Sequence, residues 1–169
     1  MSRQDEIVAI VREHSAFVWR SLRFQGVADR DLDDVGQEVF IVALRKLDDF
    51  EGRSSLRGWL YGICVKCAAA HRRRAHQRYE DLDQEPAELL AGDDPERSLA
   101  AQRSLDLLQR ALAELRPEQR DVFILYEIEQ LTMPQVADLL SCKLQTAYSR
   151  YKAAKEQVTT FVRRETRDD

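Results

Sequence analysis

Cysteine and histidine are the side chains in this 169-residue sequence best suited to metal or nucleophilic chemistry, and it has three of each. Cys64 and Cys67 form a C-x-x-C pair, and His71 follows on the same face of a predicted helix. A structural zinc ion needs four ligands, and one straight helix rarely closes a tetrahedral set. We therefore favour simple packing of small side chains and predict no metal and no cofactor. A metal- or redox-sensing role of Cys64 and Cys67 remains the alternative.

Catalytic motifs are absent from the sequence. It contains no phosphate-binding G-x-x-x-x-G-K-[ST], no G-x-S-x-G and no H-E-x-x-H, and His14, His71 and His76 have no evident Ser/Cys–His–Asp arrangement. We predict a protein that is not an enzyme. The first residues include acids and no apolar signal core, and no apolar run is long enough to span a bilayer. These features predict a cytoplasmic protein with reduced cysteines and no membrane insertion.

Charge is distributed along the chain in blocks. The net charge of −4, taken alone, disfavours a nucleic-acid partner, but a partner responds to the local field rather than to the sum. Residues 53–79 carry seven bases and no acid, and residues 141–164 carry six bases and one acid. Between them, residues 80–97 carry eight acids and one base. The two basic blocks predict two surfaces for an anionic partner, and the acidic block has the composition of a linker.

The first basic block interleaves aromatic side chains with its bases. Rings stack on nucleobases while cations follow phosphates, so this pattern is typical of single-stranded nucleic-acid binding. The alternative places aromatic residues in the core and leaves the arginines solvated, and for Trp59 taken alone the core is favoured. For Arg72, Arg73 and Arg74 an anionic partner is favoured, because no neighbouring acid in the block compensates their charge.

The second basic block has the layout of a helix-turn-helix. Thr132 can cap a short helix over 133–140, and residues 141–143 separate it from a basic helix over 144–164. Its small core is predicted to consist of Val136, Ala137, Leu140, Leu144, Ala147 and Tyr151. The polar and basic groups left free suit base edges in the major groove. The alternative is an ordinary pair of amphipathic helices in a bundle.

Hydrophobic spacing and the Gly, Pro and capping residues predict helices throughout the chain. We expect helices over 5–24, from about 31 to 47, over 56–79, from 98 to before Pro117, over 118–128, over 133–140 and over 144–164. Asp29 or Asp31 is expected to cap the second helix, and Ser54 or Ser55 the third. The predicted fold class is all-α, with two small helical domains, 1–79 and 98–169, joined by an acidic linker at 80–97.

Taken together, four blocks resemble the extracytoplasmic-function (ECF, group IV) sigma factors of the sigma-70 superfamily, which are bacterial transcription initiation factors. The match spans nearly the whole chain. The blocks are Asp33–Phe40, similar to D-x-x-Q-[ED]-x-F; Phe50–Ile63, similar to the loop and helix that melt and bind the −10 element; Leu115–Phe123, similar to the opening of the fourth sigma region; and Leu144–Arg150, similar to that region's recognition helix, commonly V-x-T-V-K-S-R.

The resemblance implies roles for particular residues. The residues implied to bind polymerase, at the clamp helices of its β′ subunit, are Asp33, Asp34, Gln37, Glu38 and Phe40. The residues implied to bind −10 DNA are Phe50, Gly52, Arg53, Ser54, Ser55, Arg57, Trp59, Tyr61, Lys66, Arg72, Arg73 and Arg74. The residues implied to bind −35 DNA are Gln145, Thr146, Tyr148, Ser149, Arg150, Lys152 and Lys155. Further implied partners are the polymerase β flap, promoter DNA and an anti-sigma factor.

Four positions depart from the family pattern. Lys66 and Ala70 stand where Asn and Asp are common, and Lys143 stands where Ser is common. Tyr148 replaces a common Lys and offers an aromatic ring that could pack on a base or its methyl group. A stand-alone helix-turn-helix regulator, acting without polymerase, is the alternative function. Such regulators usually dimerise, and no heptad seam is evident here, so we expect a monomer when the protein is free.

Overall fold

The computed structural model describes the backbone of residues 3–52, 55–82 and 98–167. The chain divides into two compact units, Met1–Asp93 and Asp94–Asp169, which are described separately below. Every regular element in the described ranges is helical, which confirms the all-α prediction. The predicted acidic linker lies outside the described residues, except that residues 80–82 continue the third helix.

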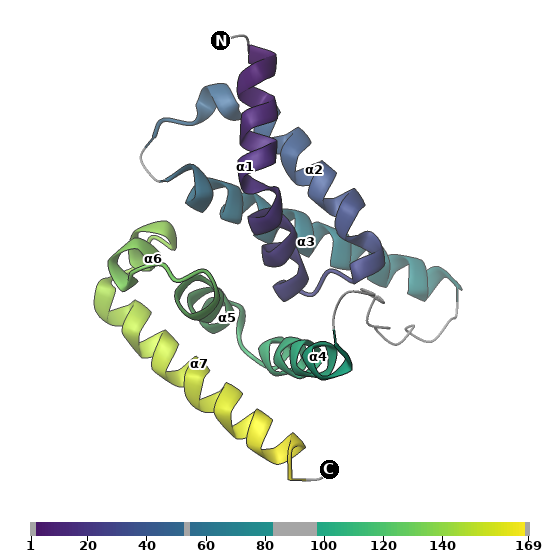
Figure 1. Cartoon of the computed structure of the whole chain (residues 1–169), viewed down its shortest axis with the longest axis vertical. Helices are drawn as coiled ribbons and strands as arrows, with labels where there is room; N and C mark the ends of the chain where they lie inside the picture. The colour runs from purple at the N-terminus through teal and green to yellow at the C-terminus, as the bar shows by residue number, and fades with distance from the viewer. Residues whose placement is uncertain (1–2, 53–54, 83–97, 168–169) are drawn as a thin grey trace. The chain divides into compact units, whose positions relative to one another are not determined.

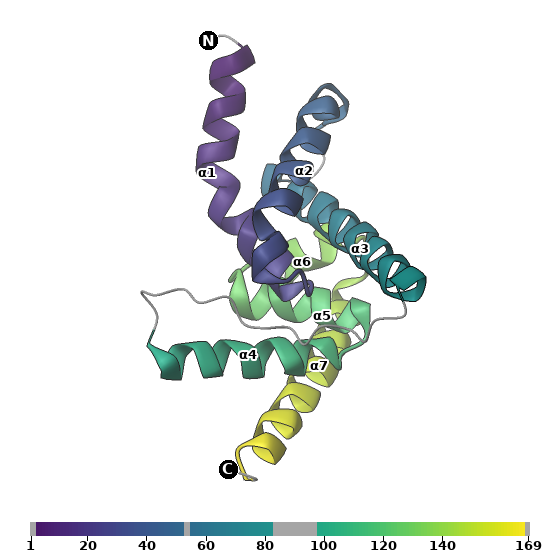
Figure 2. The ribbon, with the colours of Figure 1, turned by 90° about the vertical axis from the view of Figure 1, so that its right-hand side faces the viewer.

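Three helices form the first unit: α1 (Arg3–Phe24), α2 (Leu32–Arg45) and α3 (Leu56–Leu82), with short turns η1 (Asp29–Asp31) and η2 (Leu47–Asp49) beside α2. Each of the three helices packs against the other two (Figures 1 and 2). Apolar residues at helical spacing place one stripe of each helix in a shared core. The fully buried members of that core include Val18, Leu22, Val39, Leu60, Cys64 and Ala68.

Gly36 allows α1 and α2 to approach closely. A Cβ atom at this position would lie 2.7 Å from ring atoms of Trp19, well inside van der Waals contact. The indole Nε1 of Trp19 donates a hydrogen bond of 2.8 Å to Oδ1 of Asp33, which fixes the ring across the helix pair. A glycine inside a helix is normally unfavourable. At position 36 a glycine is needed because the indole of Trp19 occupies the space that a side chain would take.

The predicted helix boundaries in the first unit hold at two positions. Gly26 has φ +89° just after α1, a left-handed conformation that glycine adopts without strain. The hydroxyl of Ser55 accepts a hydrogen bond of 3.1 Å from the backbone N–H of Gly58, so Ser55 caps α3.

The predicted aspartate cap of α2 is wrong. Asp31 precedes α2 but makes no side-chain cap hydrogen bond. Its carboxylate instead lies 3.2 Å from Nε2 of His71 on α3. Asp29 accepts a hydrogen bond of 2.9 Å from Nε of Arg23 on α1. Both carboxylates are therefore directed to partners on neighbouring helices rather than to the end of their own.

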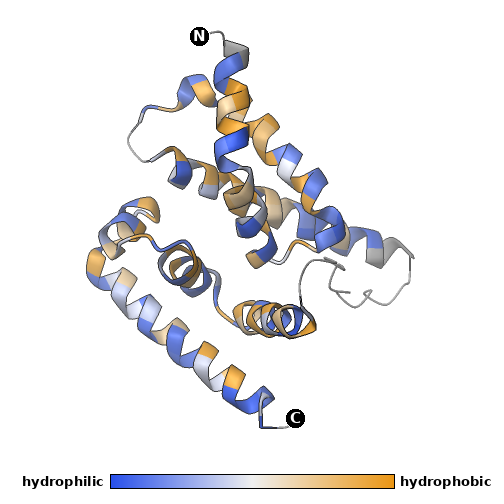
Figure 3. Ribbon diagram, in the orientation of Figure 1, coloured by the Kyte–Doolittle hydropathy of each residue, from blue (hydrophilic) through white to orange (hydrophobic). Residues whose placement is uncertain are grey.

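Four helices and a π-helical turn form the second unit: α4 (Leu99–Ala113), α5 (Pro117–Phe123), η3 (Ile124–Ile128), α6 (Met133–Leu139) and α7 (Leu144–Glu165). The long helix α7 packs against α4, α5 and α6. The single helix predicted over 118–128 is α-helical only in its first part, because Ile124–Ile128 form the π-helical turn η3. Figure 3 shows hydrophobic segments alternating with hydrophilic ones along α7, as expected for an amphipathic helix.

Local capping sets the boundary of α6. Thr132 Oγ1 accepts a hydrogen bond of 3.4 Å from the backbone N–H of Gln135, and Gln135 Oε1 accepts one of 2.9 Å from the backbone N–H of Thr132. This reciprocal capping box confirms the predicted start of the helix. Pro117 occupies the first turn of α5, where its missing N–H has no consequence.

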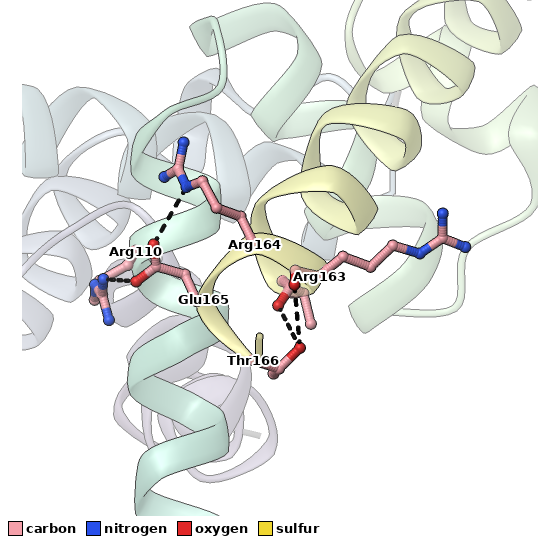
Figure 4. Close-up of polar contacts among 6 residues, drawn as sticks. Arg110, Arg163, Arg164, Glu165 and Thr166 are labelled. Carbon is pink, nitrogen blue, oxygen red and sulfur yellow. Dashed lines mark hydrogen bonds and ion pairs between the residues drawn. The ribbon is translucent and has the colours of Figure 1, made fainter. Parts of the chain in front are cut away.

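The end of α7 is fastened to α4 by a cluster of charged and aromatic side chains. Glu165 accepts hydrogen bonds from Arg110 of α4 and from Nε of Arg164, as Figure 4 shows. The two guanidinium groups lie 5.6 and 5.0 Å from the ring centre of Phe161. Thr166 Oγ1 donates a 2.9 Å hydrogen bond to the carbonyl of Val162, closing the last turn. The C-terminal end of α7 is therefore attached to α4, and its N-terminal end comes directly after the turn that follows α6.

Candidate nucleic-acid interface

The start of α3 carries an aromatic pair. Phe50 and Trp59 are both half-buried, and their ring centres lie 5.2 Å apart. Gly52, exposed with φ +68°, lies in the connection that leads into α3. The guanidinium of Arg57 lies 4.6 Å from the ring centre of Phe17. Phe50, Trp59 and the exposed Ser55, which lies four residues before Trp59, form a partly accessible aromatic surface, whereas Arg57 faces another side of α3. The predicted Arg53 and Ser54 lie outside the described residues.

Tyr61 of the predicted −10 set does not contribute to this surface in the structure, and its DNA contact stays a prediction. Its side chain is 1% exposed, and its hydroxyl accepts a hydrogen bond of 2.9 Å from Nε2 of the buried Gln25. The apolar ring and the satisfied hydroxyl make Tyr61 part of the core of the first unit. Trp59, two residues earlier on α3, faces a different direction and keeps part of its ring accessible.

Most basic residues of α3 are exposed, and a carbonyl and a carboxylate of neighbouring segments engage two of them. Lys66 and Arg73 are exposed on the helix. Arg72 donates a hydrogen bond to the carbonyl of Gln25. Arg74 forms an ion pair with Glu38 of α2, with 2.9 Å between Nη2 and Oε2. Arg72 and Arg74 are thus held by residues of neighbouring segments, and the contact of these arginines with DNA stays a prediction.

The acidic face of α2 consists of Asp33, Asp34 and Gln37, all exposed, with Glu38 partly exposed beside it. Phe40 is 5% exposed, and its ring centre lies 6.0 Å from that of Trp19. In this structure the Phe40 ring packs between α1 and α2, and its contact with polymerase stays a prediction.

Ile41 is an exposed residue of α2 that is not among the residues implied to bind polymerase. Its side chain is 49% exposed and lies on the α2 face that carries Asp34 and Gln37, seven and four residues earlier. The sequence signal for it was the apolar run around Ile41, which contains more apolar residues than one buried stripe of a helix can use.

The helix-turn-helix is formed by α6, a short turn and α7. Ser141 has φ +51° in that turn, and the backbone N–H of Cys142 donates a 3.0 Å hydrogen bond to the carbonyl of Ala137. Val136, Ala137 and Ala147 are buried as predicted, and Leu140 and Tyr151 are half-buried.

The prediction that Leu144 lies in the core is wrong, because its side chain is 44% exposed. The buried stripe of α7 consists of Ala147, Ala154, Val158 and Phe161. At about 100° per residue, Leu144 lies about 60° from the direction of Ala147 and about 40° from that of Tyr148. Leu144 therefore shares the exposed side of the first turn with Tyr148, which is 48% exposed.

The rest of the predicted −35 face is accessible. Gln145, Ser149 and Lys152 are exposed, and Thr146 and Arg150 are half-buried. Ser149 Oγ donates a hydrogen bond of 3.0 Å to the carbonyl of Gln145, which uses its hydroxyl proton within the helix. These side chains lie on the first half of α7, directly after the turn.

Lys155 is exposed on α7 and takes part in a polar cluster with Glu127 and Tyr151. Its Nζ lies 3.9 Å from Oε1 of Glu127 in η3, and the hydroxyl of Tyr151 donates a hydrogen bond to the same carboxylate. Tyr126 packs edge-on against Tyr151, with ring centres 4.7 Å apart. Burial, together with the hydrogen bond to Glu127, raises the pKa of Tyr151. Lys155 is thus already engaged with an acid of its own domain.

The C-x-x-C pair is buried in the core of the first unit. Burial is the main cause that raises the pKa of both the Cys64 and the Cys67 thiol, so both stay protonated at neutral pH. His71 faces Asp31 instead of the cysteines. In the part of the chain that the structure describes, no group of three or more His, Cys, Asp or Glu side chains could hold a metal ion.

Comparison with known protein families matches each of the two helical units to a region of one protein class. Residues 10–79 match the family "Sigma-70 region 2", and residues 105–158 match "Sigma-70, region 4". The first range covers most of the α1–α3 bundle and the second covers the helix-turn-helix unit. The ECF RNA polymerase sigma-E factor of Escherichia coli is 30% identical over 151 residues, covering 84% of this chain and 79% of that protein. The chain belongs to the ECF sigma factors.

Other sigma factors are similar over comparable lengths. The RNA polymerase sigma-H factor of Pseudomonas aeruginosa is 30% identical over 138 residues, covering 76% of this chain and 72% of its own length. The RNA polymerase sigma factor CnrH of Cupriavidus metallidurans is 28% identical, with coverage of 90% and 84%. The protein is thus an RNA polymerase sigma factor, and a stand-alone regulator is not favoured because regions 2 and 4 occur in order in one chain.

Two solved structures share the fold of this sigma factor. CnrH in complex with the cytosolic domain of CnrY gives a TM-score of 0.69 at 23% identity, covering 95% of this chain and 90% of that one. The sigma factor RpoE in complex with the anti-sigma factor NepR, from Bartonella quintana, gives 0.68 at 19% identity, with coverage of 94% and 97%.

The family identifies the protein as a transcription initiation factor, a class that does not act as catalytic enzymes. None of the described helices is both long and apolar enough to cross a membrane.

Proposed function

We propose that this sigma factor binds core RNA polymerase through the acidic face of α2. Asp33, Asp34 and Gln37 supply exposed polar groups, and Ile41 adds an apolar contact on the same face. Asp33 also holds Trp19, which stiffens the helix pair that presents this face. The occupant implied by the family is the pair of clamp helices of the β′ subunit, and the β flap is the second implied contact.

We propose that α3 and the connection before it bind the −10 element as a single strand. The observation that supports this is the partly accessible Phe50–Trp59 pair, with the exposed Lys66 and Arg73 seven and fourteen residues after Trp59 on the same side of α3. Rings of this kind stack on bases while cations contact phosphates. A base extruded from the duplex needs a few kcal/mol of compensation, which such contacts supply. The buried Tyr61 takes no part in this surface.

We propose that α7 reads the −35 element as duplex DNA. The N-terminal half of the second helix of a helix-turn-helix enters the major groove, and in this chain it presents Gln145, Tyr148, Ser149 and Lys152. Arg150 is the candidate for a base contact, because arginine pairs with guanine through two hydrogen bonds. Lys155 contributes to phosphate binding only by leaving Glu127.

We infer that an anti-sigma factor regulates the protein. Two sigma factors of the same fold were solved in complex with other proteins, one with the cytosolic domain of CnrY and one with the anti-sigma factor NepR. The free protein is proposed to be monomeric and to work in the cytoplasm, where core polymerase and promoter DNA are found.

Transcription reconstituted from core polymerase and promoter DNA tests this function. Core enzyme with this chain should start transcription from a defined set of promoters, and core enzyme alone should not. Arg150→Ala should lose promoter use selectively, by about ten- to a hundredfold at promoters with the preferred −35 sequence. Arg163→Ala, an exposed arginine at the other end of α7, is the matched control. Failure of the chain to bind core polymerase would refute the proposal.

A further inference from the structure

Two large apolar side chains remain exposed at the start of α7. Leu144 and Tyr148 are 44% and 48% exposed and lie four residues apart, so they sit one above the other on the same helix face. The core of the second unit does not use them, because α7 already packs through Ala147, Ala154 and Val158.

The surroundings of this pair match DNA better than an apolar protein surface. Lys143 precedes Leu144, and Gln145, Ser149 and Lys152 are exposed on the same half of α7. The block over residues 141–164 carries six bases and one acid. A small apolar patch surrounded by cations and hydrogen-bonding groups complements the major groove, where the 5-methyl group of thymine is the apolar feature among polar base edges.

The first turns of a recognition helix are also the part that reaches base edges. Tyr148 has an aromatic face and Leu144 two methyl groups, and both can cover a thymine methyl without needing a hydrogen-bond partner from it. Burying one methyl-sized group contributes roughly a fourfold change in binding, which is enough to prefer thymine over a base without the methyl group.

We propose that Leu144 and Tyr148 form a thymine-methyl reader that sets part of the −35 specificity of this sigma factor. The proposal rests on the proposed function, in which α7 enters the major groove of the −35 element. It adds Leu144, which was expected in the core, to the residues that read the −35 element, and it assigns Leu144 and Tyr148 one shared target, the thymine methyl group.

Deoxyuridine provides a direct test, since it differs from thymidine only by the missing methyl group. A duplex pool with a randomised −35 segment is first selected with the holoenzyme, and the selected duplex is resynthesised with deoxyuridine at each of its −35 thymines in turn. Holoenzyme affinity is measured by competition against the unmodified duplex. A thymine in the spacer between the two elements is the control position.

The wild-type holoenzyme should bind about fourfold more weakly when one particular −35 methyl group is removed. Leu144→Ala and Tyr148→Ala should bind both duplexes with nearly equal affinity, and Tyr148→Phe should keep the wild-type preference. Both alanine substitutions lie at exposed helical positions, where alanine favours the helix, and circular dichroism verifies that the variants fold.

Three outcomes would overturn the proposal. The first is a wild-type holoenzyme indifferent to every −35 methyl group. The second is a variant that keeps the full methyl preference. The third is a variant that loses affinity for core polymerase itself, which would assign the pair to a protein contact. Each differs from failure of the proposed function, in which no duplex is selected and no transcription begins.

Discussion

Arg74 of α3 and Glu38 of α2 form a two-point ion pair, with 2.9 Å between Nη2 and Oε2 and 3.4 Å between Nη1 and Oε1. The pair joins the surface proposed for polymerase to the one proposed for the −10 strand. An arginine engaged by a carboxylate offers less positive field to DNA phosphates, and both side chains are partly exposed, so the pair can be opened at small cost.

Glu38→Gln should therefore strengthen binding of the free protein to single-stranded DNA. An exposed pair contributes about 0.2–1 kcal/mol, so we expect an increase of about two- to fivefold in low salt, measured by fluorescence anisotropy with a labelled oligonucleotide of mixed sequence. Asp34→Asn makes the same change of net charge at an exposed position of α2. An equal gain in both variants would assign the effect to net charge and not to release of Arg74.

Gly36→Ala should destabilise the first unit. The added Cβ would lie 2.7 Å from two atoms of the Trp19 ring, so the indole must move and its hydrogen bond to Asp33 is lost. Overpacking typically costs 1–3 kcal/mol, while alanine recovers about 1 kcal/mol of helix propensity. We expect a net loss of about 1 kcal/mol in urea unfolding.

Tryptophan fluorescence is a suitable probe for this variant because both tryptophans, Trp19 and Trp59, lie in the first unit. Gly62→Ala is the matched control, since a Cβ at Gly62 of α3 meets nothing within 4 Å. It should be neutral or stabilising. A loss as large in Gly62→Ala as in Gly36→Ala would contradict the steric explanation.

The buried thiols should make the first unit less stable as the pH rises above the ordinary thiol range. Burial raises the pKa of Cys64 and Cys67 in the folded state. Above about pH 8.5 the unfolded chain loses these protons and the folded chain keeps them. Because the folded state then binds more protons, the free energy of unfolding falls with rising pH, by at most about 1.4 kcal/mol per pH unit for each thiol.

Urea unfolding followed by tryptophan fluorescence between pH 7 and 10 measures that slope. Cys64→Ala should make the slope shallower than in the wild type, whatever its effect on stability at pH 7. Cys142→Ala changes a half-buried cysteine of the second unit and should leave the slope of the first unit as it was. A slope identical in Cys64→Ala and in the wild type would show that the thiol does not titrate on unfolding.

The carboxylate of Glu165 should titrate at a higher pH when Arg110 is replaced. The hydrogen bond from Arg110 is the largest cause that lowers the pKa of Glu165, with Arg164 adding to it. The ion pair at the end of α7 is therefore present above the ordinary glutamate range, about pH 4.3, and is lost as the pH falls through the lowered value.

Carbon-detected NMR titration of the Glu165 carboxyl group is the measurement. Arg110→Gln should move the midpoint upward toward the ordinary value, and the contact should weaken in high salt because it is exposed. Arg103→Gln alters another exposed arginine of α4 and should have a smaller effect. An unchanged midpoint in Arg110→Gln would show that Arg110 does not hold the carboxylate in solution.

Much of the secondary structure was predictable because its signals are local. Gly26 adopts the left-handed conformation after α1, Pro117 begins α5, and Thr132 with Gln135 forms the capping box of α6. Each depends on residues within four positions of one another, so the order of the amino acids is sufficient to find them. The assignment to the sigma factors likewise came from ordered motifs along the chain.

The division of candidate residues between core and surface was not predictable in the same way. Helix α3 is apolar on more than one side, so periodicity cannot separate the buried Tyr61 from the half-buried Trp59. For the same reason, periodicity did not show that Phe40 is buried, and it wrongly placed the exposed Leu144 in the core. The ion pair of Glu38 with Arg74 joins residues 36 positions apart, which no local pattern encodes.

The sequence by itself determined the all-α character, several of the helix boundaries, the alternating blocks of charge and the family. The tertiary structure alone decided which aromatic and apolar side chains remain accessible to a partner, and which charged groups are already paired. The physical reason is that propensity, capping and charge belong to short segments, whereas burial and ion pairing depend on how helices pack across long separations in the chain.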